Sequence, residues 1–197
     1  MFTLLSGLWQ RWQQRYEYYA LIIGLDAAGK TTLLEKIKEI YIAKYPQGGK
    51  KVIPTVGLNV AKILLHSIRL VFWDLGGQLD LHELWHNYYR EAHGIIYVID
   101  STDRERLQES KDVFDHVLMT RELEGVPILI LCNKQEHPNA MTVQDIKQTL
   151  NQSAHKLGLR DCKVQGVSAV SGENVRESVE WLASRMQRNP ARPPKLA

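Results

Sequence analysis

The clearest chemical pattern in the sequence lies between Gly24 and Thr31, which read GLDAAGKT. These residues match G-x-x-x-x-G-K-[ST], follow the apolar run YYALII and open the helix-favouring stretch KTTLLEKIKEI. Glycines let a loop bring its backbone N–H groups close to phosphates, while Lys30 reaches the β- and γ-phosphates and Thr31 offers a hydroxyl to Mg²⁺. The sequence therefore predicts a phosphate-binding loop at a helix N-terminus, where the helix dipole favours anions.

Two later segments can complete such a site. Thr55, in PTVGLN, is placed to give a second hydroxyl to Mg²⁺ and to sense the γ-phosphate. In WDLGGQ, Asp74 can hold Mg²⁺ through water, the Gly77 amide can meet the γ-phosphate, and Gln78 can orient an attacking water. The alternative for WDLGGQ is a Gly-Gly turn with Asp74 capping the next helix. Because a phosphate loop precedes it, we favour the nucleotide interpretation.

The segment NKQE, at 133–136, bears on which base is bound. Its carboxylate can accept hydrogen bonds from guanine N1–H and the 2-amino group together, and adenine presents no such pair of donors. Asn133 is predicted to bridge the base and the phosphate loop, with the stem of Lys134 against the ring. Beyond the next strand, the backbone amides of Ser168 and Ala169 are placed to meet guanine O6. The sequence therefore favours GTP over ATP.

Loops of this kind usually end in Asp, whereas this one ends in Glu136, which keeps the charge and adds one methylene. The carboxylate must pull back, or the loop must relax, to reach the base. A misfit of this size is expected to cost about 1–3 kcal/mol, or roughly a tenfold to hundredfold loss of affinity. We predict that guanine remains the base and that nucleotide exchange is faster.

The order of apolar and helical segments predicts an α/β fold that positions these motifs near strand ends. Strands are expected at 18–23, 58–65, 69–73, 94–99, 127–131 and 163–167, and helices at 30–44, 82–91, 104–120, 143–156 and 174–186. Strands flanked by helices imply a mostly parallel sheet covered on both faces. The short connection at His66-Ser67 makes a hairpin, so we expect six strands with one antiparallel.

The composition limits the size, the partners and the compartment that can be expected for this protein. A chain of 197 residues supports one well-buried core, and the formal charge of +3 does not call for a nucleic-acid partner. The two cysteines predict reduced thiols in a cytosolic protein. The apolar runs fall short of the roughly 18–20 residues that cross a bilayer.

The two ends of the chain differ from the domain expected at 18–188. Residues 1–17 predict an amphipathic helix, with aromatic and apolar residues on one stripe: Phe2, Leu5, Trp9, Trp12 and Tyr16. Such a helix can bind a membrane surface, or it can dock permanently on the domain. Residue 2 is not the Gly that N-myristoylation requires, so we expect a second attachment signal or a membrane receptor. The Pro-rich, basic tail at 189–197 is expected to be disordered.

Taken together, GLDAAGKTT, PTVGLNV, WDLGGQ, LW..YY and VIDSTDRERL resemble the Arf branch of the small GTPases over residues 18–186. TLLSGL and RNPARPP are most similar to its Arf-related members. The resemblance implies a small GTPase fold and a monomeric switch that cycles between GDP and GTP, with Mg²⁺ and slow intrinsic hydrolysis. It implies exchange factors, GTPase-activating proteins and effectors as partners. It also implies a cytoplasmic protein that cycles onto Golgi and trans-Golgi membranes in vesicle trafficking, through its N-terminal helix and a membrane-protein receptor.

The resemblance also assigns roles to single residues. Thr31 and Thr55 are the expected Mg²⁺ ligands, and Gln78 positions the hydrolytic water. Asp26 stands where many small GTPases have Gly, and is expected to crowd the space that an arginine finger would enter. The nucleotide contacts carried over are Gly24, Asp26, Ala27, Ala28, Gly29, Lys30, Thr31, Thr32, Thr55, Asp74, Gly77, Asn133, Lys134, Glu136, Ser168 and Ala169.

An effector-facing surface is implied at Leu58, Trp73 and Tyr88. Leu58 departs from the usual Phe of the family, which puts ordinary Arf effectors in doubt. For Trp73 and Tyr88 the alternative is packing in the core.

Two classes of function remain open. One is a regulatory GTPase, supported by Gln78, Thr55 and Asp74. The other is a nucleotide-holding interaction module that does not cycle, which Glu136 and Asp26 favour. Single-turnover hydrolysis separates the two classes. A P-loop kinase or ATPase would require an acceptor-substrate or arginine-rich lid segment, and the sequence contains no such pattern.

Overall fold

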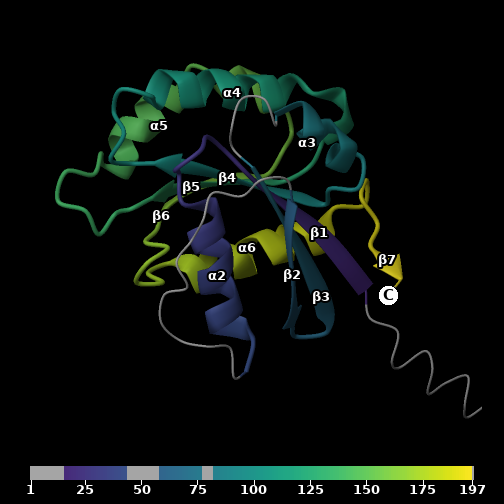
Figure 1. Cartoon of the computed structure of the whole chain (residues 1–197). Helices are drawn as coiled ribbons and strands as arrows, with labels where there is room; N and C mark the ends of the chain where they lie inside the picture. Colours follow the sequence, from purple (N-terminus) through teal and green to yellow (C-terminus); the bar gives the residue numbers. More distant parts are fainter. Residues whose placement is uncertain (1–15, 44–57, 77–81, 197) are drawn as a thin grey trace, which may run out of the picture.

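The structure, a computed structural model of the chain, describes residues 16–43, 58–76 and 82–196. At its centre the strands form a sheet in the order β2-β3-β1-β4-β5-β6, with β7 beside β1 (Figure 1). The strands are β1 (Tyr16–Ile23), β2 (Leu58–Leu65), β3 (Ile68–Leu75), β4 (Gly94–Asp100), β5 (Ile128–Asn133), β6 (Cys162–Gly166) and β7 (Lys195–Leu196). The helices are α2 (Lys30–Tyr41), α3 (His82–Tyr89), α4 (Leu107–Met119), α5 (Val143–Asn151) and α6 (Val175–Arg188), with short 3₁₀ turns η2 (Arg121–Leu123) and η3 (Ala154–Lys156).

The pairing of the strands confirms the predicted fold class. β1 runs parallel to both β3 and β4, and β5 runs parallel to β4 and β6. β2 and β3 form the antiparallel hairpin expected from the short connection between them. The central strands GIIYVID and ILILCN are almost wholly buried and rich in β-branched residues, as strands covered on both faces require.

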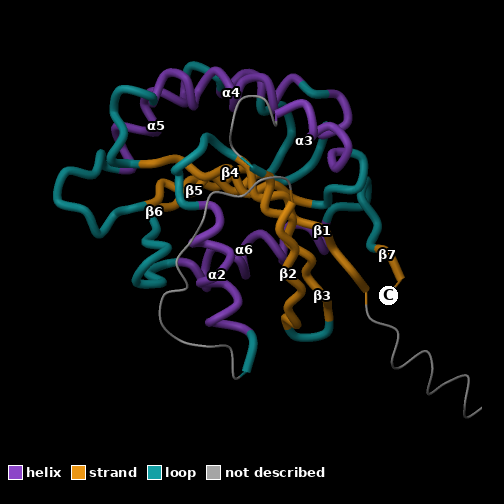
Figure 2. The backbone as a smooth tube through the Cα atoms, in the orientation of Figure 1, coloured by secondary structure: helices purple, strands orange, loops and turns teal. Residues whose placement is uncertain are grey.

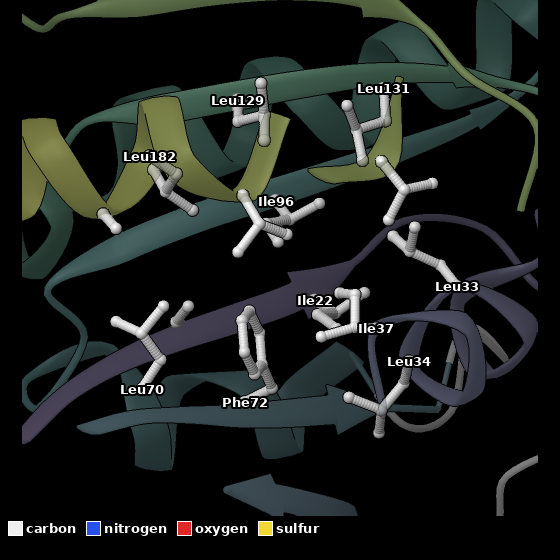
Figure 3. Close-up of a cluster of buried hydrophobic side chains, with 14 of the residues drawn as sticks. Ile22, Leu33, Leu34, Ile37, Leu70, Phe72, Ile96, Leu129, Leu131 and Leu182 are labelled. Carbon is white, nitrogen blue, oxygen red and sulfur yellow. The ribbon is translucent and has the colours of Figure 1, made fainter. Parts of the chain in front are cut away.

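Helices cover both faces of the sheet and create two cores (Figures 1 and 2). Under α2 and α6, buried side chains such as Ile22, Leu34 and Phe72 pack together (Figure 3). A second cluster, which includes Trp85 and Phe114, lies between the sheet and the helices α3, α4 and α5. Within the described ranges, no helix is both long and apolar enough to cross a bilayer.

The start of the domain differs from the predicted boundary. Tyr16 and Glu17, placed by the sequence in the N-terminal helix, belong to β1 and pair with Ile68 and Arg69 of β3. Glu17 is buried, and its carboxylate accepts a hydrogen bond from the Arg69 guanidinium at 2.7 Å. The rest of the predicted helix, residues 1–15, lies outside the described residues.

The C-terminal tail also departs from the prediction of a disordered segment at 189–197. Residues 189–196 lie along the domain, and β7 pairs antiparallel with the first two residues of β1. The Arg192 guanidinium donates to the carbonyls of Arg90 and Glu122, and a ring nitrogen of His93 bonds to the Pro193 carbonyl at 3.0 Å. A Pro-rich composition signals a lack of apolar burial, but it carries no sign that the first residues of β1, which extend beyond the part paired with β4, offer the tail hydrogen-bond partners.

Candidate nucleotide-binding site

The described parts of the predicted motifs meet at the carboxyl ends of the parallel strands. The loops after β1, β4, β5 and β6 all leave the sheet at this edge, where β3 also ends (Figure 1). Open α/β sheets bind ligands in the crevice outside these strand ends. Segments separated by more than a hundred residues in the sequence are therefore neighbours around one site.

The phosphate loop has a backbone that only glycine permits at two positions. Gly24 has φ +139°, and a Cβ added there would lie 2.3 Å from the backbone oxygen of Val98 in β4. Gly29 has φ +92°, and its Cβ would lie 2.3 Å from the side-chain nitrogen of Asn133. The phosphate loop thus packs directly against β4 and against residues 133–136, here called the base loop. This leaves no space for a side chain at either glycine.

Lys30 is buried at the start of α2, and its ammonium is held inside the loop. Nζ donates to the carbonyls of Gly24 and Leu25 at 3.0 and 2.8 Å. Burial lowers the pKa of Lys30 to about 8, while the charges of Asp74 and Asp26 act in the opposite direction. A cation stripped of water and fixed by the loop backbone is ready to contact phosphate oxygens.

The lowered pKa of Lys30 predicts that nucleotide binding depends on pH. In the folded protein the pKa of Lys30, about 8, lies below the usual lysine value, because burial disfavours the charged amine. This burial lowers the free energy of unfolding while the amine is charged, and the loss is recovered as the pH rises through 8. Bound phosphates raise this pKa again, so binding near pH 8 must take up protons. We expect the affinity for GDP to fall above pH 8, by at most about tenfold per pH unit.

Titration calorimetry at pH 8 in two buffers of different ionisation heat measures this proton uptake. Equal binding heats in both buffers, after correction for dilution, would contradict a protonation step at Lys30. Lys163 offers a matched control: it is partly exposed and pairs with Glu177, and Lys163→Met, which removes an amine outside the phosphate loop, should leave the proton uptake unchanged.

The oxygens expected to hold Mg²⁺ lie together. The Thr31 hydroxyl donates to a carboxylate oxygen of Asp74 at 2.8 Å, and Asp74 is fully buried. A hydroxyl beside a buried carboxylate suits Mg²⁺, which takes oxygen ligands. The side chains present therefore fit this ion. The other predicted ligand, Thr55, lies outside the described residues, as do Gly77 and Gln78.

Asn133 joins three segments of the site. Its side-chain nitrogen donates to the carbonyl of Ala28 in the phosphate loop at 2.9 Å, and its oxygen accepts from the Ala169 N–H at 3.0 Å. The side chain is 2% exposed. Asn133 therefore fixes the base loop against the phosphate loop and the segment after β6, and any base bound there meets a framework already in place.

Asp100 is a site residue that the sequence reasoning did not identify. Asp100 is the last residue of β4 and pairs with Asn133 of β5. Its carboxylate accepts a hydrogen bond from the Lys134 ammonium at 2.5 Å. Burial raises the pKa of Asp100, but hydrogen bonds from Lys134 and Thr102 outweigh it and hold the pKa below its usual value. Lys134 has φ +67°, an uncommon conformation for a non-glycine residue. An acidic residue directly after a buried strand was the available signal.

The two amides predicted to meet guanine O6, in the segment after β6, have hydrogen-bond partners in the structure. The Ser168 amide donates to the Glu173 carbonyl at 3.3 Å, and the Ala169 amide donates to Asn133. Both amides therefore have partners within the protein, and their contact with guanine O6 stays a prediction. Glu136, by contrast, is exposed in the turn after β5.

Asp26 also has a partner that the sequence reasoning missed. Its carboxylate is 54% exposed and accepts the Arg106 guanidinium at 2.8 Å. Arg106 precedes α4 and lies eighty residues further along the chain, so no local pattern pointed to this pair. The neighbouring Ala27 is exposed, and Thr32 lies partly buried in the first turn of α2.

The three positions implied for effectors have different surroundings. Leu58 is exposed at the start of the edge strand β2. Trp73 is partly exposed, and its ring packs 4.7 Å from Tyr19 and 5.1 Å from Tyr88. These aromatic rings therefore both pack against the domain and keep part of their surface accessible.

Comparisons with known proteins agree with this geometry. The profile of the ADP-ribosylation factor family (Arf) matches residues 3–186. The chain is 48% identical over 196 residues to human ADP-ribosylation factor-related protein 1, covering 99% of this chain and 98% of that protein. It is 46% identical over 196 residues to ADP-ribosylation factor-like protein 3 of Saccharomyces cerevisiae, covering 98% of each.

A solved structure extends the comparison to the fold. The Arl6 BBS3 small GTPase from Trypanosoma brucei, with bound nucleotide analogue GppNp, matches with a TM-score of 0.76 at 26% identity. The match covers 88% of this chain and 99% of that one. The matches in sequence and fold confirm the resemblance read from the motifs: the chain belongs to the ADP-ribosylation factor family of small GTPases.

Proposed function

We propose that this GTPase is a regulatory switch that cycles between GDP and GTP forms and hydrolyses GTP slowly. The observation that carries the proposal is the single framework around Asn133, which links the phosphate loop, the base loop and the segment after β6. Binding of one guanine nucleotide across these segments would couple recognition of base and phosphates. Such coupling is what a switch requires.

The described side chains suit phosphoryl transfer by positioning and electrostatics. Lys30 would contact the phosphates from within the loop, and Thr31 with Asp74 would hold Mg²⁺. Mg²⁺, when bound, neutralises charge that develops on the phosphate oxygens. Gln78 would orient the attacking water. Activating proteins would supply much of the rate, which is why we propose a slow intrinsic reaction.

The base is the first point to test, because Glu136 carries the predicted contact. In this experiment GTP and ATP are each tested as competitors of fluorescent GDP, on the wild type and on Glu136→Asp. We expect GTP to compete and ATP not to compete, and Glu136→Asp to slow GDP release about tenfold or more, since the shorter side chain removes the misfit.

Glu124→Asp is the matched control, because Glu124 is exposed before β5, at the opposite end of that strand from Glu136. If fluorescent GDP does not bind, or GTP does not displace it even at high concentration, the proposed switch is wrong. If ATP competes as well as GTP, the base assignment is wrong.

Hydrolysis distinguishes the switch from an interaction module that holds nucleotide without cycling. In single-turnover assays, the switch shows slow release of phosphate that a GTPase-activating protein accelerates. A non-cycling module shows no release in either condition. The donor set of Thr31 and Asp74 supports the switch.

Membrane recruitment is the remaining part of the proposal. The amphipathic pattern of residues 1–15 and the family resemblance support attachment to Golgi and trans-Golgi membranes, with exchange factors, effectors and a membrane-protein receptor as partners. The same preparations test the lipid step: the chain loaded with a GTP analogue should sediment with vesicles more strongly than the GDP form. Equal sedimentation would contradict a nucleotide-dependent membrane step.

A further inference from the structure

The segment between β4 and α4, residues 101–106, contacts both nucleotide-binding loops. The Arg106 guanidinium donates to Asp26 of the phosphate loop at 2.8 Å. In the same segment, the Ser101 hydroxyl accepts from the Gln135 side chain of the base loop at 2.8 Å. The segment thus links the phosphate loop to the base loop.

Arg106 is held in place from a second direction. Its Nε donates to an oxygen of Asp103 at 2.6 Å, and its backbone N–H donates to the other oxygen of that carboxylate at 3.1 Å. The guanidinium therefore keeps its position without help from Asp26, and presents one edge to the phosphate loop. A planar, fixed guanidinium of this kind can orient a carboxylate.

The carboxylate that Arg106 orients lies in a loop built for anions. Asp26 is close enough to Lys30 for its charge to act on the lysine that contacts phosphates. Asp26 is also the more exposed partner of the ion pair, at 54% against 35% for Arg106. Without Arg106, the carboxylate is free to turn over the loop, where it would repel bound phosphates. GTP carries one more phosphate group than GDP, so GTP would be repelled more.

We propose that Arg106 is a positioning residue that acts through Asp26, holding its carboxylate on the α4 side so that the phosphate loop accepts a triphosphate. This inference rests on the proposed guanine-nucleotide function. It assigns to Arg106 a part of the preference between GTP and GDP, although the residue lies outside the phosphate loop itself.

A double-mutant cycle tests the proposal. Affinities for a non-hydrolysable GTP analogue and for GDP are measured for wild type, Arg106→Ala, Asp26→Asn and the double variant. We expect Arg106→Ala to weaken binding of the GTP analogue about two- to fivefold, the range of an exposed ion pair, and to weaken GDP less. In the Asp26→Asn background, Arg106→Ala should have almost no effect on either ligand.

Two further variants separate positioning from general charge. Arg106→Lys keeps the charge and should restore part of the preference for the GTP analogue. Arg104→Ala removes an exposed arginine of the same segment and should leave both affinities unchanged. The effect of Arg106→Ala should also shrink at high salt, since both partners are partly exposed.

The outcomes distinguish this inference from the proposed function. If Arg106→Ala weakens both ligands equally, or acts equally with and without Asp26, Arg106 works by through-space charge or by supporting α4, and the inference is overturned. If wild type binds neither guanine nucleotide, the proposed function itself is wrong, and the inference falls with it.

Discussion

Asn133→Ala should lose most of its affinity for guanine nucleotides and part of its stability. The substitution leaves two buried groups without their partner: the Ala28 carbonyl, which accepts at 2.9 Å, and the Ala169 N–H, which donates at 3.0 Å. An unsatisfied buried polar group costs about 1–3 kcal/mol, so the two together cost about 2–6 kcal/mol. Part of this cost is paid in the free protein and lowers its free energy of unfolding.

The loss of affinity follows from the same two contacts. Without Asn133, the phosphate loop and the segment after β6 are no longer fixed relative to the base loop, so binding must order them. We expect the Kd for GDP to rise at least about a hundredfold, which corresponds to roughly 3 kcal/mol. Displacement of fluorescent GDP measures the Kd, and urea unfolding measures the stability.

Asn139→Ala is the matched control, because Asn139 is exposed in the turn that follows the base loop. It should change neither quantity by more than a few tenths of a kcal/mol. Asn133→Asp keeps an acceptor for the Ala169 N–H but places a carboxylate oxygen against the Ala28 carbonyl, so it should also bind GDP more weakly than wild type. If Asn133→Ala binds GDP as tightly as wild type, the framework around Asn133 does not organise the site.

Gly24→Ala is the second substitution with a large expected effect. Its backbone φ of +139° disfavours any side chain, and the new Cβ would lie 2.3 Å from the backbone oxygen of Val98. Because Val98 belongs to the central strand β4, neither backbone can move without disturbing the sheet. Strain and overpacking add to an expected loss of about 3–5 kcal/mol in the free energy of unfolding.

Gly125→Ala separates strain from the lack of space. Gly125 also has a positive φ, +74°, but a Cβ added there meets nothing within 4 Å. Strain alone should cost this variant about 1–2 kcal/mol. Urea unfolding of the two variants beside wild type measures the difference. Equal losses would show that the contact between Gly24 and β4 has no energetic weight.

The predicted strands and the phosphate loop agree with the structure because their signals are local. An apolar run such as GIIYVID requires burial on both faces, which a central strand provides. The residues Gly29, Lys30 and Thr31 at the start of a helix are typical of a phosphate loop. The hairpin of β2 and β3 was predictable for the same reason, because two residues between strands allow no crossover.

Hydrogen bonds between distant residues could not be predicted in this way. The pairs Lys134–Asp100 and Arg106–Asp26 join residues 34 and 80 positions apart, and each partner alone reads as an ordinary polar residue of a loop. The hydrogen bond from the Ala169 amide to the side chain of Asn133 is a third such contact, between residues 36 positions apart. Such contacts depend on which strands become neighbours.

The two ends of the domain show the same difference between local patterns and long-range contacts. Tyr16 continues the apolar stripe of the predicted N-terminal helix, yet Tyr16 and Glu17 both pair with β3, because hydrogen bonds along a strand outweigh a weak helical pattern. The tail has the composition of a disordered segment, yet its residues Lys195 and Leu196 pair with the first two residues of β1. Local pattern was enough to predict the phosphate loop and the strands, since both depend on neighbours in the chain. The folded chain alone settled which polar groups meet across the site, since those contacts depend on the order of strands in the sheet.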